Sequence, residues 1–577
     1  MLLYYQLLLQ YGGKPRWTLL IHNGPLFPPL YVPHNIPVII NNKEYILSNI
    51  AEEYATIYVK YFDTDYIQNS KFKKNFWKDF KKILSGKNDI IDVSNIKFID
   101  DIDFTLINNY VIEKKKNKIK LNNLEKEEIE KNEEKYKYCF IDGIKQNIGN
   151  YKIEPPSIFI GRGNHPKIGC IKKRINPNDV TLNLSKNAPI PIPSICESCE
   201  STTEKSDSHD LINSNNNNES CKWLKIIHDR NVIWLASWKD TITGDIKYIY
   251  TSMDSFFKSK SDEDKFNLAK KLKKKVIEIR KTYTEQLLDK DMKIRQLATA
   301  LYLIDNLAIR VGGNKDTKEE ADTVGATSLR VEHITLLEND EKLDNEKSKD
   351  EKSDNIYMIK LDFLGKDSIR FYKKIKVTET VYNNIKLFSK DKSKKDLLFN
   401  LINANLLNNY LNDFMPNLTA KVWRTYNASY LFQIEIDKIK INNKIQPDER
   451  LNYLLSMFNH ANAEVALLCN HQKGKVTKID NIINKYNDKI KKYKKLIIGK
   501  TGDKAKKIKS KIKILKITKN LKTKNVLLGT SKNNYIDPRI IFAFMKKHNI
   551  NKSNLFFTKS LLKRFEWAKD VDENYKF

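Results

Sequence analysis

The chain has 577 residues, which at roughly 100–200 residues per domain corresponds to about three to five domains. Apolar residues make up 40% of the sequence and charged residues 30%, a balance typical of globular rather than disordered proteins. The 103 Lys and Arg outnumber the 71 Asp and Glu, and the net charge of +32 argues against an ordinary metabolic enzyme and predicts a polyanionic partner.

The first 255 residues combine short β-like runs, Pro-rich turns and helices, and we expect one or two α+β domains there. Met1–Leu9 is apolar, but it lacks the basic lead and the cleavage site of a signal peptide, and no apolar run reaches the roughly 20 residues of a membrane span. Residues 194–220 are rich in Ser, Asn and acidic residues and are predicted to be a disordered insertion. Cys196 and Cys199 lie in it without a second pair at zinc-ligand spacing, and six cysteines in all favour a reducing compartment.

Residues 256–474 are predicted to be mainly helical, with one β-hairpin. An apolar stripe from Ile294 to Ala308 alternates spacings of three and four, and we expect this helix to continue until Gly312 and Gly313 stop it. Residues 357–363 and 368–372 read as the two strands of the hairpin, joined by a turn at 364–367. A second helical stripe covers 451–468, and a polar insertion is expected at 338–354.

Positive charge is concentrated between Lys473 and Lys524, where 20 Lys, no Arg and three acidic residues give a net charge of +17. Apolar residues recur there at the a/d spacing of heptads. They are Val476, Ile479, Ile483, Tyr486, Ile490, Tyr493 and Ile497. Gly499 and Gly502 interrupt this stripe and a shorter one follows, which predicts an antiparallel helical hairpin. The alternative is a solvated charged helix, but lysines four residues apart repel each other, which favours a position beside nucleic acid.

Four polar residues stand out by their predicted positions. Arg310 is expected in the last turn of an apolar helix, Lys366 at the tip of the hairpin, Arg424 within an apolar helix and His471 at a helix end. Each also has a non-catalytic explanation: a capping cation, an ordinary turn residue, an ion-pair partner and a capping histidine, respectively. For His471 taken alone, the capping role is the favoured explanation.

The compact C-terminal piece, residues 525–577, contains the segment Gly529–Arg539 with Tyr535 at its centre. With this segment added to those before it, the sequence resembles the eukaryotic, type IB, DNA topoisomerase I family. The resemblance extends from about Trp17 to Phe577, and its motifs follow in order along the chain. They are Ile153–Pro156, Gly161–Lys167, Ser328–Ile334, Asp362–Arg370, Leu418–Ala428, Cys469–Gln472 and the Tyr535 segment.

The resemblance implies an enzyme that cuts one strand of duplex DNA, lets positive or negative supercoils relax by strand rotation, and reseals the strand. The family's catalytic residues fall on Tyr535, Arg310, Lys366, Arg424 and His471. Tyr535 would form a 3′-phosphotyrosine bond that conserves the phosphodiester energy, so no ATP is expected to be required. The sequence also lacks a Gly-x-x-x-x-Gly-Lys-Ser/Thr phosphate loop.

The charged residues of this set have complementary expected roles. Arg310 and Arg424 would hold the non-bridging phosphate oxygens through forked donors, and His471 would add a further hydrogen bond. Lys366 would protonate the leaving 5′-oxygen as a general acid. With these donors a catalytic metal is dispensable, and the sequence has no Asp/Glu cluster of the two-metal type, so Mg²⁺ is not expected to be essential.

DNA contacts are implied by resemblance as well. Arg162 and Asp367 lie in segments that approach the bases near the cleavage site, and Asn534 matches a position associated with the camptothecin pocket. Lys167 and Glu319 fall in two segments that close around the duplex as opposing lips.

Two residues, Gly529 and Thr530, are expected to shape the loop that carries Tyr535. The Gly312–Asn314 segment, which precedes Glu319, is one residue longer than the family pattern.

The implied fold is a multidomain α+β protein. It has an N-terminal segment (1–11), a mixed α/β DNA-binding cap (12–255) and a mainly helical catalytic domain with the β-hairpin (256–474). An antiparallel coiled-coil linker (475–524) and a small helical C-terminal domain (525–577) complete it. We expect a monomer that encloses double-stranded DNA, does not bind membranes, and acts on chromosomes in the nucleus and nucleolus.

The chain departs from the family at two places, and two other readings remain. It starts near the core with the apolar Met1–Tyr11 instead of a long charged tail, so we expect a truncated or mis-started N-terminus, and Ile160 replaces a frequent Arg.

A tyrosine recombinase uses a related Arg, Lys, Arg, His and Tyr set, but it needs sequence-specific sites and a tetramer. A non-catalytic DNA-binding protein is the other alternative. The Gly161–Lys167 segment and the Lys-rich hairpin favour the topoisomerase.

Overall fold

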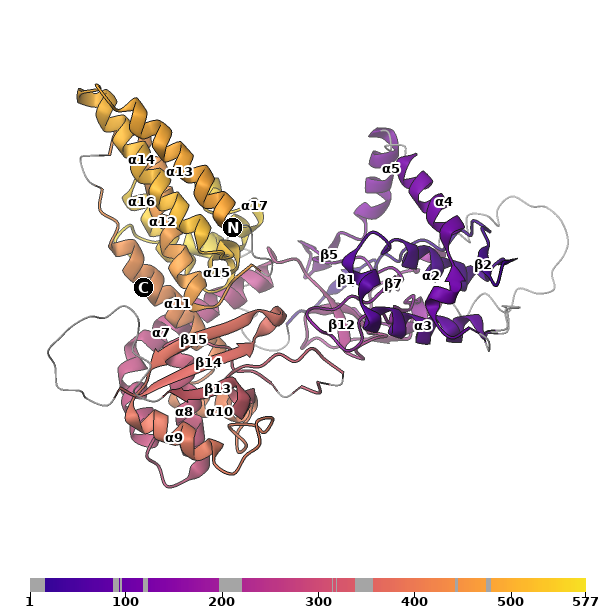
Figure 1. Ribbon diagram of the computed structural model, residues 1–577, viewed down its shortest axis with the longest axis horizontal. Coiled ribbons are helices and arrows are strands. Elements are labelled where there is room, and N and C mark those ends of the chain that lie inside the picture. The colour runs from indigo at the N-terminus through magenta and orange to yellow at the C-terminus, as the bar shows by residue number, and fades with distance from the viewer. Residues whose placement is uncertain are drawn as a thin grey trace. The chain divides into compact units, whose positions relative to one another are not determined.

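The computed structural model describes residues 16–86, 93, 96–117, 123–196, 221–313, 315–317, 319–337, 356–441, 445–473 and 479–577. The predicted 1–11 segment, nearly all of the 194–220 insertion and the 338–354 insertion lie outside these ranges. The chain forms two compact units, the first running up to Lys258 and including Asp316–Asp322, the second made of Ser259–Lys315 and Thr323–Phe577. Small sheets and many helices make it a mixed α/β protein, which agrees with the predicted α+β class (Figure 1).

The described residues of the first unit form four small sheets. Their strands are β1 (Leu20–His22), β5 (Tyr138–Ile141) and β6 (Ile144–Asn147) in one sheet, and β10 (Lys225–Ile227), β9 (Val180–Asn183), β11 (Trp234–Lys239) and β12 (Ile246–Tyr250) in another. The other two are β3 (Lys43–Tyr45), β2 (Val38–Ile40) and β4 (Ile102–Asp103), and the pair β7 (Ser157–Ile158) and β8 (Ile171–Lys172). Trp17, Leu182, Trp238 and other buried residues of the first two sheets share one hydrophobic cluster.

The helices of the first unit are α2 (Asn49–Val59), α3 (Ser70–Leu84), α4 (Thr105–Lys116) and α5 (Asn123–Glu134). Helix α3 begins where the Asn69 side chain accepts hydrogen bonds from the first backbone N–H groups. Its buried residues Phe72, Phe76 and Phe80 recur every four residues, so they form one stripe. The Phe76 ring stacks on Tyr58 of α2, with ring centroids 4.2 Å apart, and this aromatic cluster fills the second core of the unit.

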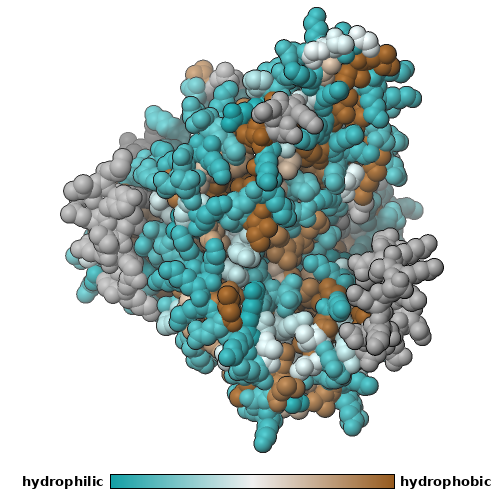
Figure 2. Space-filling model, turned by 90° about the vertical axis from the view of Figure 1, so that its left-hand side faces the viewer, coloured by the Kyte–Doolittle hydropathy of each residue, from teal (hydrophilic) through white to brown (hydrophobic). Residues whose placement is uncertain are grey.

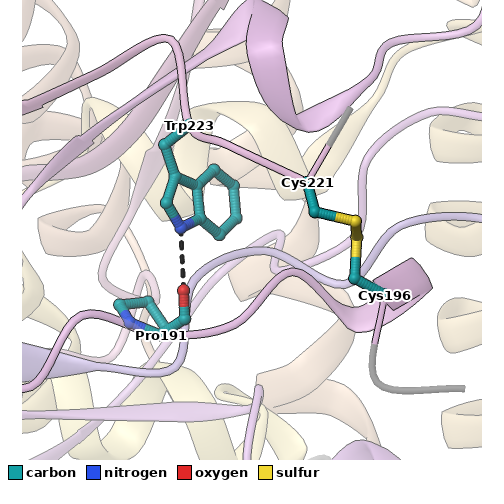
Figure 3. Close-up of a disulfide and its surroundings, with 4 residues drawn as sticks. All are labelled: Pro191, Cys196, Cys221 and Trp223. Carbon is teal, nitrogen blue, oxygen red and sulfur yellow. Dashed lines mark hydrogen bonds between the residues drawn. A yellow bond between two sulfur atoms is a disulfide. The ribbon is translucent and has the colours of Figure 1, made fainter. Parts of the chain in front are cut away.

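A disulfide joins Cys196 to Cys221, with the two Cα atoms 6.1 Å apart (Figure 3). Beside it, the Trp223 indole nitrogen donates a hydrogen bond to the carbonyl of Pro191, at 2.8 Å. The bond joins the two described residues on either side of residues 197–220. The low cysteine count did not predict it; Cys139, Cys170 and Cys469 are free thiols among the described residues.

The described part of the second unit is mainly helical, with one three-stranded antiparallel sheet. Its strands are β13 (Ile334–Leu337), β14 (Met358–Leu364) and β15 (Arg370–Lys376). The helices before the linker are α7 (Phe256–Gln286), α8 (Met292–Leu307), α9 (Glu379–Ser389), α10 (Ala404–Phe414), α11 (Ala420–Asp437) and α12 (Arg450–Leu468). The last helices are α15 (Leu528–Asn534), α16 (Pro538–Lys547) and α17 (Lys559–Arg564). Residues of α16 and α17 lie in the same hydrophobic core as α8 and α11, so the C-terminal piece packs as part of this unit.

The predicted hairpin is confirmed: β14 and β15 pair antiparallel from Met358↔Lys376 to Leu364↔Arg370. The expected end of the helix before Arg310 was wrong. Helix α8 ends at Leu307, and the next residue, Ala308, adopts a left-handed conformation (φ 49°) that stops the helix before the glycines. Arg310 therefore lies beyond the end of the helix.

The linker contains two helices, α13 (Ile479–Leu496) and α14 (Gly502–Thr523), which pack against each other (Figure 1). The break between them falls at the predicted glycines. Along α13 the predicted seam residues are buried or half-buried while the lysines between them are exposed, so the heptad pattern correctly identified the packed face. The supercoil itself stays a prediction.

Helix α14 also packs on α12, where Lys511 pairs with Glu449 (3.7 Å) and Lys524 pairs with Glu464. The linker is therefore held partly by the body of the second unit. Its two ends are bonded to each other: the Lys473 N–H donates to Asn525 O (3.1 Å), and the Leu527 N–H to His471 O (2.8 Å).

The surface is predominantly polar. On the face drawn in Figure 2, hydrophilic side chains predominate and apolar ones lie in patches between them. Among the described helices, none combines the length and the apolar composition that a membrane span requires.

Candidate active site

The centre of the site is the contact between Arg424 and Tyr535. The Arg424 Nη1 group donates a hydrogen bond to the Tyr535 hydroxyl (2.9 Å), and the guanidinium carbon lies 4.8 Å from the centre of the tyrosine ring. Two further donors of Arg424 bond to backbone carbonyls, Nε to Ala308 O (2.6 Å) and Nη2 to Cys469 O (3.4 Å). Arg424 is only 3% exposed, so these bonds fix a buried cation against the phenol.

A buried carboxylate sets the position of Arg424. Asp305 on α8 accepts a hydrogen bond from the Trp423 indole (3.0 Å), and its backbone carbonyl accepts one from Asn427 (2.7 Å). Both donors lie on α11, on either side of Arg424 in the sequence. Asp305 also forms a two-bond ion pair with Arg280 at 2.8 Å. These hydrogen bonds fix α11 relative to α8, and they place Arg424 beside Ala308, the residue that follows α8.

Arg310 is placed beside Arg424 by a close backbone contact. Its carbonyl accepts the Ala326 N–H (2.8 Å), and a Cβ on Gly325 would lie 2.5 Å from the Gly312 nitrogen. Only residues without a side chain allow these two segments to approach so closely. The pKa of Arg310 is lowered, mainly by burial and next by the charge of Arg424, while its contact with Tyr535 acts in the opposite direction.

Lys366 lies at the β14–β15 turn, as predicted. It is exposed, and it lines the same pocket as Arg310 and Arg424. The next two residues, Asp367 and Ser368, have positive φ angles of 65° and 56°, conformations that non-glycine residues rarely adopt. Such local strain is characteristic of functional turns, and here it gives the hairpin tip a defined shape.

His471 lies beyond the C-terminal end of α12, with its side chain 4% exposed. Its ring centre is 5.4 Å from that of Tyr535. Nδ1 is 2.7 Å from the hydroxyl of Ser531, whereas Nε2 is buried without a hydrogen-bond partner in the described part of the chain. Burial, followed by the charges of Arg424 and Arg310, lowers the pKa of His471 to about 3, so the imidazole is neutral.

Tyr535 directly follows helix α15, which differs from the expected loop at Gly529 and Thr530. The Tyr535 N–H donates to Ser531 O (2.9 Å), and the Tyr535 carbonyl accepts from Ser429 Oγ (2.9 Å). The backbone on both sides of the nucleophile candidate is thus fixed. Asn534 donates from its amide to the Thr530 carbonyl (3.1 Å), and its own carbonyl accepts from Lys265 (2.9 Å).

The remaining predicted DNA contacts are distributed over both units. Asp367 is exposed in the second unit, next to Lys366, and Arg162 is exposed in the first. Lys167 forms an ion pair with Glu319, and it also donates to the carbonyl of Ile242 (2.8 Å). The two residues assigned to opposing segments are therefore in contact, within the first compact unit.

Sequence reasoning did not identify Ser531 and Ser429, which hold His471 and Tyr535. A signal for Ser531 existed, because it lies one helical turn before Tyr535 in a segment that carried the resemblance. A serine inside the apolar helix α11 was the weaker signal for Ser429.

Comparison with known families gives matches over nearly the whole chain. The model described as the DNA-binding fragment of eukaryotic DNA topoisomerase I matches residues 15–213 and 210–251. The model of its catalytic core matches 254–502, and that of the C-terminal topoisomerase domain matches 505–577.

Similar individual proteins carry the same description. The chain is 37% identical to DNA topoisomerase 1 of Homo sapiens, over 98% of this chain and 73% of the human protein. It is 37% identical to DNA topoisomerase 1 of Caenorhabditis elegans (97% and 68%) and 36% identical to DNA topoisomerase 1 alpha of Arabidopsis thaliana (98% and 60%). The chain thus spans 60–73% of the lengths of these relatives.

Proposed function

Because the chain belongs to the eukaryotic DNA topoisomerase I family, we propose that it relaxes supercoiled DNA by cutting and rejoining one strand through Tyr535. The observation that carries this proposal is the hydrogen bond to the Tyr535 hydroxyl from the buried Arg424, which lines a pocket together with Arg310 and Lys366. A structural tyrosine has no need of this arrangement. A nucleophile that attacks a phosphodiester does need cationic donors beside its oxygen.

The proposed reaction consists of a cleavage step, which transfers the phosphoryl group to Tyr535, and a resealing step, which reverses it. The Tyr535 hydroxyl releases its proton to water, its oxygen bonds to the phosphorus while the bond to the 5′-oxygen breaks, and the leaving oxygen takes a proton from Lys366, which regains one from water. Arg310 and Arg424 neutralise the charge that develops on the non-bridging oxygens, and His471 donates from Nε2. Resealing reverses these steps: the 5′-hydroxyl attacks the phosphotyrosine and Tyr535 leaves. One phosphodiester is exchanged for another, so no ATP or Mg²⁺ is proposed to be required.

Charge supports DNA as the partner. The chain carries +32 overall, of which the segment from Lys473 to Lys524 contributes +17. Contacts to phosphates by so many lysines give binding that weakens steeply with salt. We further propose that Lys167 and Glu319 close around the duplex, with Arg162, Asp367, Asn534 and Thr530 near the cut, and that the enzyme acts as a nuclear monomer.

The test is relaxation of plasmids carrying negative or positive supercoils, in EDTA and without ATP. The wild type should relax both without a defined recombination site. Tyr535→Phe should bind DNA but neither relax it nor form a covalent adduct. The matched control is Tyr430→Phe, since Tyr430 is an exposed tyrosine on α11, and it should keep wild-type activity. An inert wild type, or an adduct in Tyr535→Phe, would overturn the proposal.

A further inference from the structure

The contact between His471 and Ser531 carries information about where the imidazole proton lies. The two atoms, His471 Nδ1 and Ser531 Oγ, are 2.7 Å apart, and both side chains are buried, at 4% and 0% exposure. A neutral imidazole has one protonated and one unprotonated nitrogen, so the bond can run in either direction. The direction decides whether Nε2, the nitrogen without a partner, is a donor or an acceptor.

The environment of the hydroxyl favours one direction. Among the described residues, His471 Nδ1 is the only side-chain or backbone group that bonds to Ser531 Oγ. If Nδ1–H donated, the Ser531 hydroxyl hydrogen would be left buried without an acceptor, which is unfavourable. If the hydroxyl donates, its hydrogen is satisfied and Nδ1 accepts. Burial and the charges of Arg424 and Arg310, which lower the pKa of His471 to about 3, exclude the doubly protonated ring near neutral pH.

We propose that Ser531 is a positioning residue that donates its hydroxyl hydrogen to Nδ1 of His471 and thereby keeps the imidazole proton on Nε2. This inference rests on the proposed function, because the Nε2–H donor is useful only if a phosphate oxygen comes to lie beside it. In the opposite tautomer, Nε2 would present a lone pair to that oxygen and repel it.

The backbone of Ser531 connects this donor to the nucleophile. The Ser531 carbonyl accepts the N–H groups of Tyr535 (2.9 Å) and Ile536 (3.1 Å). One residue therefore fixes the end of α15 through its carbonyl and the tautomer of His471 through its side chain. Tyr535 and the Nε2–H donor are held in a fixed relation to each other by this single turn.

The test is a double-mutant cycle on the rate of single-turnover cleavage, measured with a duplex whose cut cannot be resealed. Ser531→Ala removes the hydroxyl and leaves the backbone carbonyl, and we expect cleavage to slow by about 5–10-fold with unchanged DNA affinity. In a His471→Gln background, the amide donor has no tautomer to select, so adding Ser531→Ala should change the rate by less than about twofold. Ser510→Ala, at a buried serine of the linker helix α14, is the matched control and should cleave at the wild-type rate.

The outcomes separate this inference from the proposed function. An equal loss in both backgrounds means that Ser531 acts by packing, and no loss in either means that the hydroxyl is irrelevant; both results overturn the inference. Absence of any covalent adduct with the wild type overturns the proposed function instead. Ring ¹⁵N chemical shifts of His471 give a direct check, because an Nδ1 that carries the proton would contradict the assigned direction.

Discussion

His471 should show no titration in the pH range where an ordinary histidine changes charge. Its pKa is lowered from 6.5 to about 3, first because the ring is buried and then because Arg424 and Arg310 are positively charged. The perturbation that reveals this is His471→Gln, which keeps a hydrogen-bond donor but cannot be protonated. The informative quantity is the ratio of the wild-type cleavage rate to the rate of this variant.

The expected size follows from the two pKa values. With the ordinary pKa of 6.5, the neutral fraction of His471 would rise about tenfold, from about 10% at pH 5.5 to about 90% at pH 7.5. With a pKa of about 3, more than about 99% of the ring is neutral throughout this range. The rate ratio should therefore stay constant within about 20%, although both rates change as other groups titrate.

The assay is single-turnover cleavage at DNA concentrations below saturation, so that the pH dependence reports groups of the free enzyme. Dividing the two rates at each pH removes the contribution of every group that the two enzymes share. A ratio that changes about tenfold with an inflection near pH 6.5 would refute the reasoning, because it would mean that burial and the two guanidinium groups do not lower the pKa of His471.

Three further perturbations test other parts of the structure. Arg424→Lys should slow cleavage by about 10²–10³-fold, because one ammonium cannot bond to both the Ala308 carbonyl and Tyr535; a near-wild-type single-turnover rate would contradict this. Gly325→Ala should lower the thermal unfolding midpoint, at a cost of about 1–3 kcal/mol, because its Cβ would lie 2.5 Å from a backbone nitrogen. Gly313→Ala, where a Cβ meets no atom within 4 Å, is its control, and equal midpoints would disprove the argument. Deleting 475–524 should leave cleavage intact but reduce processivity above about 150 mM salt, and unchanged processivity across a salt series would show that the linker lysines do not contact DNA.

Local patterns predicted those parts of the fold that local interactions determine. The β14–β15 hairpin was predicted because its alternation and its Leu364–Asp367 turn are contained in about twenty residues. The packed face of α13 was predicted because a heptad stripe records burial directly. Lys366 was located correctly for the same reason, since its position depends only on the turn.

Features that depend on distant contacts were missed. Helix α8 ends early because the Ala308 carbonyl is bonded by Arg424, a residue more than a hundred positions away, and a stripe of apolar residues carries no sign of that bond. Helix α15 forms although Gly529 and its neighbours are poor helix formers, because distant contacts hold it: Asn462 bonds to the Leu528 carbonyl (3.0 Å), and the buried Ser531 side chain contacts His471. The resemblance supplied the five candidate residues, but the partnership of Ser531 with His471 appeared only in three dimensions.

The backbone hydrogen bonds that join the two ends of the linker bear on whether the site needs an unbroken chain. Because residues 471–473 are bonded to residues 525–527, the linker between them begins and ends at the same place on the second unit. What keeps Tyr535 beside Arg424 is the burial of the segment that follows, where Ile536, Phe565 and Phe577 are each at most 1% exposed. A chain cut within the linker would therefore yield two fragments that associate to restore the active enzyme. Its activity would rise with concentration, governed by the dissociation constant of the two fragments rather than by the integrity of the backbone.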